Sequence, residues 1–171
     1  ATIRDSEFDG WLLYDFHGSN PIAVSLTGLT GRHTTRRWYY YVPAAGSAIK
    51  LVHAIEPRVL GDLPGETRTY SGRRQLETEV TRLLAGARAI AMEYSPGCAI
   101  PYVSRVDAGT IEFIRGLGVK VVSSGDLVGL AHDREQLLGE LDRFVLVPDL
   151  GEHDDELVTA ETREERLGRC H

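Results

Sequence analysis

Cysteine is scarce in this chain, basic residues are not in excess, and no long apolar run occurs. Cys98 and Cys170 are the only two cysteines among 171 residues. Two cysteines, one in mid-chain and one next to the last residue, make neither a disulfide framework nor a zinc knuckle. We therefore expect two free thiols and a reducing compartment.

Membrane and export signals are also missing. No run approaches the roughly 18 apolar residues of a transmembrane helix, and no charged and apolar leader segment opens the chain. We expect a cytoplasmic protein without a membrane partner.

Positive charge is in short supply. The net charge is −6, and residues 149–171 carry most of it, because they hold eight acidic residues against three arginines. The rest of the chain is almost neutral, so it lacks the basic face that supplies most non-specific affinity for nucleic acids. We expect no nucleic-acid partner. A content of 42% hydrophobic and 26% charged residues is that of an ordinary globular domain.

The order of apolar patterns predicts an α/β fold. Strand-like runs and helical stripes alternate along the chain, and turn residues separate them. Strands are predicted at 9–16, 35–43, 48–56, 88–93 and 119–124, and helices at 20–28, 73–86, 107–118 and directly after Ser124. The two strands on either side of Pro43-Ala-Ala-Gly46 form a hairpin. We predict a mixed β-sheet that is flanked by helices on both faces.

The domain boundary is expected near residue 130. Residues 1–130 hold the βα pattern, whereas residues 131–171 form a helical or partly frayed acidic extension.

Self-contained catalytic motifs are absent from the sequence. It holds no G-x-S-x-G elbow, no phosphate loop and no dinucleotide fingerprint. His53 and Glu56 would point to opposite faces of a strand, and "HDDE" at 153–156 belongs to a solvated acidic run. We predict no catalytic residue and no metal ligand in this chain.

The stretch "TTRRWYYYVPAAG" at 34–46 admits two interpretations. Cations beside aromatic rings are typical of a platform for single-stranded nucleic acid. The same residues are typical of a half-buried strand with two arginines at its start, and the neutral charge balance favours this second interpretation.

Several phrases taken together resemble one known family. They are "DGWLLYDFHGSNPIAVSLTGL", "TRRWYYYVPAAG", "KLVHAIEP", "LPGETRTYSG" and "IAMEYSPGCAIPYVSRVDAGTIEFIRGLGVKVVSSGDLV". Over residues 8–128 the chain resembles the N-terminal domain of the creatinase, aminopeptidase P and prolidase family, the Xaa-Pro peptidases. The resemblance implies an α/β domain with a ribonuclease H-like motif.

The resemblance also implies what this part of the protein does. In the family a second, pita-bread domain is catalytic and binds two divalent metal ions (Mn, Co or Zn) through two Asp, one His and two Glu. Asp107 in "VDAGT" has no second metal-ligand aspartate at the required distance, so the metal pair is implied only for a catalytic domain that these residues do not contain. Two alternatives follow: part of a longer Xaa-Pro peptidase, or a stand-alone binding or scaffold module.

Family members use this domain to build a dimer or larger homo-oligomer and to close the substrate cleft against all but short, proline-containing peptides. An arginine guanidinium can bind a substrate carboxylate through two parallel hydrogen bonds. On this basis we expect substrate contacts, if any, at Arg36, Arg37, Trp38, His33 and Asn20, with Tyr39 and Arg32 as further choices.

For three other acidic residues a structural role is expected. Asp107 precedes a helical stripe and is expected to cap that helix. Glu93 ends a strand, where its carboxylate is expected to cap a turn. Asp15 flanks the first connection between a strand and a helix.

Overall fold

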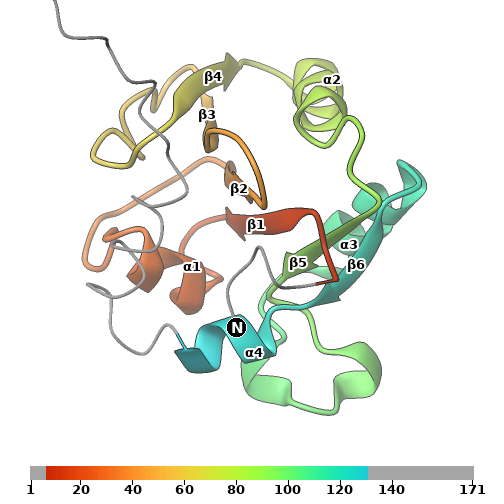
Figure 1. The fold of residues 1–171 in the computed structure, drawn as a ribbon. Coiled ribbons are helices and arrows are strands. Elements are labelled where there is room, and N and C mark those ends of the chain that lie inside the picture. The colour runs from red at the N-terminus through yellow and green to blue at the C-terminus, as the bar shows by residue number, and fades with distance from the viewer. Residues whose placement is uncertain (1–6, 131–171) are drawn as a thin grey trace, which may run out of the picture.

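A computed structural model of the protein describes residues 7–130, which build one mixed sheet with helices on both of its faces (Figure 1). The predicted extension at 131–171 lies outside the described residues. The described elements, in chain order, are β1 (Gly10–Asp15), α1 (Pro21–Leu26), β2 (Trp38–Pro43), β3 (Ile49–His53), β4 (Glu66–Tyr70), α2 (Arg73–Leu83), β5 (Ala89–Met92), the 3₁₀ turns η2 (Pro96–Cys98) and η3 (Pro101–Val103), α3 (Ala108–Gly116), β6 (Lys120–Ser123) and α4 (Gly125–Leu130).

The six strands lie in the order β4-β3-β2-β1-β5-β6. β1 and β2 are antiparallel, with Gly10 opposite Pro43 and Asp15 opposite Trp38. β2 and β3 form the predicted antiparallel hairpin. β4 runs parallel to β3, β5 parallel to β1, and β6 parallel to β5. The prediction of a mixed sheet is confirmed.

β1 is the central strand, and all six of its residues are buried. It lies between β2 and β5, and helices cover both faces of the sheet around it. A strand that is buried on both faces of its sheet has a continuous apolar sequence without alternation of polar residues. This explains the sequence of β1, in which Asp15 is the one charged residue.

The two faces of the sheet carry two separate cores. On one face, Leu26 of α1 and Leu127 of α4 pack with Trp11 of β1. On the other face, Val80 of α2 and Ile114 of α3 are both fully buried over the opposite side of β1 and β2. Each such buried side chain stabilises the fold by roughly 1.5–3 kcal/mol.

Side-chain caps begin two helices where the sequence predicts them. Asn20 Oδ1 accepts a hydrogen bond from Ala23 N (3.1 Å), and Pro21 takes the first helical position of α1. Asp107 Oδ1 accepts one from Thr110 N (2.9 Å) and begins α3. Both caps are confirmed.

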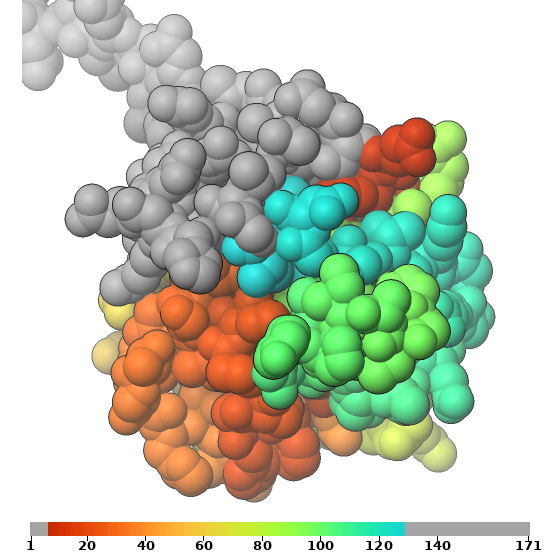
Figure 2. All heavy atoms as spheres, turned by 90° about the horizontal axis from the view of Figure 1, so that it is seen from below, coloured from red at the N-terminus to blue at the C-terminus, as the bar shows by residue number. Residues whose placement is uncertain are grey.

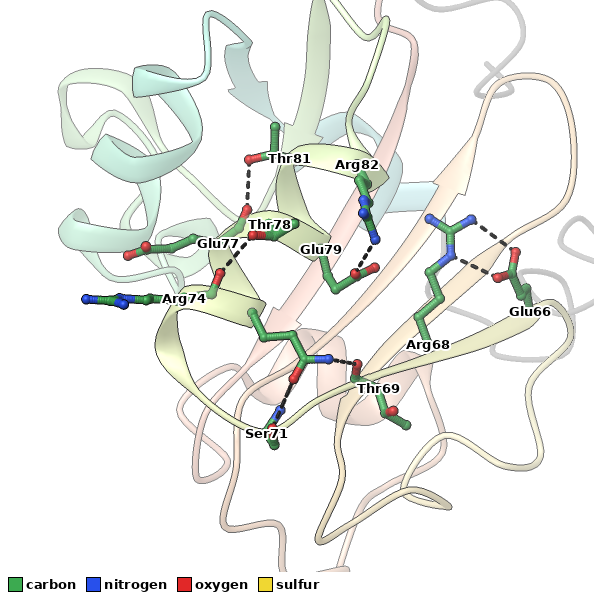
Figure 3. A network of polar contacts seen from close by, with 11 residues as sticks. Glu66, Arg68, Thr69, Ser71, Arg74, Glu77, Thr78, Glu79, Thr81 and Arg82 are labelled. Atoms are coloured by element: carbon green, nitrogen blue, oxygen red, sulfur yellow. Dashed lines mark hydrogen bonds and ion pairs between the residues drawn. The ribbon is translucent and has the colours of Figure 1, made fainter.

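β4 is the element that the sequence analysis misses. Only Tyr70 of its five residues is buried, so the segment shows no apolar alternation. It is an edge strand, and its exposed charges include an ion pair between Arg68 and Glu66 (2.9 Å), which Figure 3 shows beside α2. Charged side chains on an edge strand oppose pairing with other chains, and the same charges hide the strand in the sequence.

The loop after β5 protrudes from the α4 side of the molecule. It makes the two turns η2 and η3, each of which begins with a proline, and Ser95 Oγ accepts a hydrogen bond from Ile100 N (2.8 Å). Ile100 and Tyr102 are 51% and 79% exposed. Figure 2 shows this loop in bright green beside α4 in cyan.

No helix among residues 7–130 is long and apolar enough to cross a bilayer.

Gly65 provides a direct test of this packing. Its φ is +103°, and a Cβ there would lie 2.2 Å from the backbone oxygen of Ala48; Gly46 has nearly the same φ (+100°) but open space. Both alanine variants meet backbone strain of roughly 1–3 kcal/mol. We expect Gly65→Ala to lose about 2 kcal/mol more free energy of unfolding than Gly46→Ala, because only Gly65 also meets a backbone clash. Urea denaturation measures this difference, and equal losses would contradict it.

Candidate functional site

The carboxyl ends of five strands meet at one end of the sheet. β5 and β6 run parallel to β1, and β3 and β4 run in that same direction, because each antiparallel pairing involves β2. β2 alone begins there. The connections at this end carry His33, Arg36 and Arg37, and such connections often carry sites in α/β sheets.

Two hollows open at this end. The first, here called the basic groove, has a volume of about 330 Å³; its polar lining comes from Arg32, His33, Thr34, Glu56 and Arg58. The second, the α2–α3 cleft, has a volume of about 170 Å³; its polar lining comes from Arg37, Tyr39, Arg73, Glu77, Asp107 and Thr110. Leu76 and Phe113 add apolar walls to the cleft.

The structure separates the two arginines that the sequence places side by side. The chain bends at Arg36. Arg37 lines the α2–α3 cleft, whereas Arg36 donates from Nη1 to the carbonyl of Thr35 (3.1 Å) and lies near Glu56 on the side of the basic groove. Both are exposed. The two guanidinium groups are therefore not arranged to bind the same carboxylate.

Two of the predicted substrate contacts, Trp38 and Asn20, are buried. Trp38 is 1% exposed and packs in the core against α1. Asn20 is fully buried, and its Nδ2 donates to the carbonyl of Tyr14 (2.8 Å) and to Glu93 Oε2 (2.7 Å). Their observed roles are core packing and helix capping, which leaves Arg36, Arg37 and His33 as the exposed members of the predicted set.

Glu93 is the centre of a buried polar network. Its Oε1 accepts from Trp11 Nε1 (2.7 Å) and from Ser124 Oγ (3.2 Å), and its Oε2 accepts from Asn20. The predicted turn cap is wrong, because the carboxylate turns inward and binds three side chains from other elements. Burial raises the pKa of Glu93 to about 7, although its hydrogen bonds favour the charged form.

A second carboxylate, that of Asp15, shapes the loop after β1. It accepts from Gly18 N (3.0 Å), Asn20 N (2.9 Å) and Thr34 Oγ1 (3.4 Å). Asp15 is fully buried. It fixes both the connection to α1 and the segment that leads toward Arg36.

The basic groove also contains a carboxylate, that of Glu56, which is held by hydrogen bonds. Glu56 Oε1 accepts from the backbone N–H of Thr35 (2.9 Å). Burial raises the pKa of Glu56, but hydrogen bonds from Thr35 outweigh it, and the net pKa is lowered. The Arg32 side chain is half exposed and lies 3.7 Å from Asp62. Arg58 is also exposed. Both guanidinium groups are therefore accessible to a ligand.

No cluster suited to a metal ion occurs within residues 7–130, where no three His, Cys, Asp or Glu side chains come together. The rings of His17 and His33 are 6.2 Å apart and have no third such neighbour in this part of the chain. Cys98 is an exposed free thiol, and Cys170 lies outside the described residues.

The hydrogen-bond partners of these side chains are not evident from the sequence. Nothing in "DGWLLYD" marks Trp11 as a donor to Glu93, and Arg73 and Glu77 read only as helix surface. One usable signal exists: Glu93 and Ser124 directly follow β5 and β6, two neighbouring parallel strands, and the carboxyl ends of parallel strands meet.

Comparisons with known proteins give a fold. A scan against protein-family models and a search of curated proteins found no match. Among solved structures, the prolidase of Pyrococcus horikoshii OT3 matches with a TM-score of 0.51 and 15% identity, over 74% of this chain and 31% of that one. The chain thus spans about a third of that prolidase.

Two separate N-terminal domains match over nearly their whole length. The creatinase/prolidase N-terminal domain of an X-Pro dipeptidase from Streptococcus pyogenes matches with a TM-score of 0.52 and 13% identity, over 71% of this chain and 86% of that domain. The N-terminal domain of an Xaa-Pro dipeptidase from Lactobacillus brevis gives 0.51 and 11%, over 71% and 89%. The fold implied by the sequence resemblance is confirmed.

The buried carboxyl of Glu93 predicts a pH-dependent stability. An ordinary glutamate in the unfolded chain has a pKa of about 4.3, whereas the folded value is about 7. Between these values the folded state holds a proton that the unfolded state releases, so this group's stabilisation is complete below about pH 4 and is lost as the pH rises to 7. The gap in unfolding free energy between wild type and Glu93→Gln should therefore shrink by a few kcal/mol from pH 5 to pH 8.

Urea denaturation of both proteins at the two pH values measures this gap. The histidines and the remaining carboxylates, Asp15 included, are common to both proteins and cancel in the comparison. A constant gap, or one that widens with pH, would contradict the prediction.

Proposed function

We propose that this chain, which has the fold of a creatinase/prolidase N-terminal domain, is the non-catalytic N-terminal domain of an Xaa-Pro peptidase-like protein. The observation that carries the proposal is the match to two separate N-terminal domains over most of their length. In this role the domain assembles the oligomer and closes the substrate cleft of a catalytic domain. A divalent metal pair would belong to that catalytic domain.

The basic groove supports the gating part of the proposal. Its arginines lie in connections at the end of the sheet, and Arg36 and His33 are exposed beside them. Arginine guanidinium groups bind carboxylates in a bidentate manner, and a short peptide carries one carboxylate at its C-terminus. A cleft wall with these cations favours short, proline-containing peptides over long chains.

The loop after β5 supports the assembly part. Residues 96–102 are all exposed and carry no charge, and two prolines and the Ser95 hydrogen bond hold the backbone. Exposed apolar patches are typical of protein interfaces, and a preorganised loop loses little entropy on binding. We assign this loop to contact with a second copy of the chain.

A stand-alone binding module is the alternative. It is favoured by the exposed Arg32, His33 and Arg58 of the basic groove, because arginines can bind an acidic ligand without a metal ion. The coding sequence after residue 171 separates the two: a reading frame that continues into Asp, His and Glu metal ligands supports the peptidase, and a stop codon supports the module.

The pure 171-residue chain is expected to show no cleavage of an Xaa-Pro dipeptide, even with Mn²⁺ or Co²⁺ added, because the catalytic ligands belong to another domain. Release of proline, followed by chromatography, measures this. Robust, metal-dependent release by the wild-type chain would refute the proposal.

The assembly role predicts a self-associating chain. Ile100→Ser combined with Tyr102→Ser should weaken the dimer at least about tenfold, since the loss of central interface side chains costs 2 kcal/mol or more. Sedimentation equilibrium measures the dissociation constant. Ile55→Ser is the matched control, because Ile55 is 68% exposed but lies in the basic groove. A wild-type chain that stays monomeric, or equal weakening by the control, would count against this surface.

A further inference from the structure

The α2–α3 cleft exists because two helices cannot cover one face of a six-stranded sheet. α2 and α3 leave the middle strands β1 and β2 between them, and Tyr14 and Tyr39 fill this gap with rings 5.0 Å apart. The cleft opens where α2 and α3 begin, since Arg73 and Gly109 belong to their first turns. Tyr39 lines the cleft, and Tyr14 packs against Tyr39.

One wall of the cleft presents a fixed cation. The Arg37 guanidinium lies 4.9 Å above the ring of Phe16, and its hydrogen bond with the Tyr14 hydroxyl raises the pKa of Arg37. The Tyr70 hydroxyl donates to the Arg37 carbonyl (2.7 Å). Within residues 7–130 no carboxylate lies at ion-pair distance from this guanidinium. The cation is held in place by neutral groups.

The other walls present anions. Asp107 is fixed by Thr110, whose N–H and hydroxyl donate to its two oxygens at 2.9 and 2.8 Å. Burial raises the pKa of Asp107, but these hydrogen bonds, another with Tyr14 and the positive charge of Arg37 together outweigh it and leave the net pKa lowered. The carboxylate is therefore charged at neutral pH. Glu77 projects from α2 on the side away from Arg82, as Figure 3 shows. It lines the same cleft, but its Oε1 already accepts a hydrogen bond from Arg73 Nε, which also lines the cleft, at 2.8 Å.

The size of the cleft limits what it can hold. Its volume of about 170 Å³ is below the roughly 300 Å³ at which pockets for drug-sized ligands begin. Leu76 and Phe113 offer apolar contact beside the charged groups. A ligand that matches the volume, the opposite charges and the apolar walls of the cleft is small, carries one positive and one negative charge, and has a short apolar side chain.

We propose that the α2–α3 cleft binds one free amino acid, with its carboxylate on Arg37, its ammonium group on Asp107, and its side chain against Leu76 and Phe113. This site belongs wholly to the described chain. It needs neither a catalytic domain nor a second copy, and it is separate from the basic groove to which the gating role is assigned.

Calorimetric titration of the whole 171-residue chain tests the charge requirement. The probes are L-leucine, N-acetyl-L-leucine, which lacks the ammonium group, and L-leucinamide, which lacks the carboxylate. We expect L-leucine to bind with a dissociation constant on the order of 1 mM, as suits a ligand of about ten non-hydrogen atoms. Each analogue should bind at least about tenfold more weakly, because it leaves one charge of the cleft without its partner.

Two glycines of α3 provide a matched pair of variants. A Cβ at Gly109 would meet only Asp107 Oδ1, at 3.3 Å, and a Cβ at Gly116 would meet nothing within 4 Å. Gly109 lines the cleft, whereas Gly116, in the last turn, does not. Leucine is a better helix former than glycine, so we expect both variants to fold. Gly116→Leu should melt no lower than wild type, and Gly109→Leu about as high as wild type, because its Cβ requires Asp107 Oδ1 to shift by only a few tenths of an ångström. Gly109→Leu should abolish L-leucine binding, and Gly116→Leu should retain it.

Arg37→Gln and Arg36→Gln form a second pair, of which only the first should lose binding at least about tenfold. No heat of binding at L-leucine concentrations far above millimolar would overturn the proposal. So would equal affinity for N-acetyl-L-leucine, or full binding by Gly109→Leu. None of these results bears on dimer formation or peptide cleavage, so the two proposals fail independently.

Discussion

One buried carboxylate connects the parts of this domain that the sheet alone does not. Glu93 follows β5 and accepts hydrogen bonds from the central strand β1, from the cap of α1 and from the residue that precedes α4. Burial of a carboxylate is costly unless several donors meet it, and here three side-chain donors do. The network therefore fixes the positions of α1 and α4 relative to the sheet, and with α1 the loop that leads to the basic groove.

The strand directions decide where a site can form. Because β2 alone runs against its neighbours, five strands deliver their carboxyl ends, and the loops that follow, to one end of the sheet. That end carries the basic groove and the α2–α3 cleft on opposite sides of the bend at Arg36. Charged side chains thus gather where an α/β sheet ordinarily binds ligands.

Local signals were enough for most of the fold. The caps at Asn20 and Asp107 and the apolar stripe of α2 predicted three helices, because caps and stripes are properties of consecutive residues. β4 escaped prediction because an edge strand buries almost nothing and keeps no alternation. The site was predicted less well: Trp38 and Asn20 were expected at a surface and are buried, and Glu93 was expected at a turn and lies in the core.

The sequence by itself determined the order of helices and strands apart from β4, the caps, the near-neutral body and the resemblance to a creatinase/prolidase N-terminal domain. Only the tertiary structure decided that Arg37 lines the α2–α3 cleft whereas its neighbour Arg36 does not, and that Arg37, Asp107 and Glu77 line one cleft although they are far apart in the sequence. The physical reason is that a side chain's direction depends on a bend in the backbone, and its partners depend on which strands lie side by side. Neither is recorded in the spacing of residues along the chain.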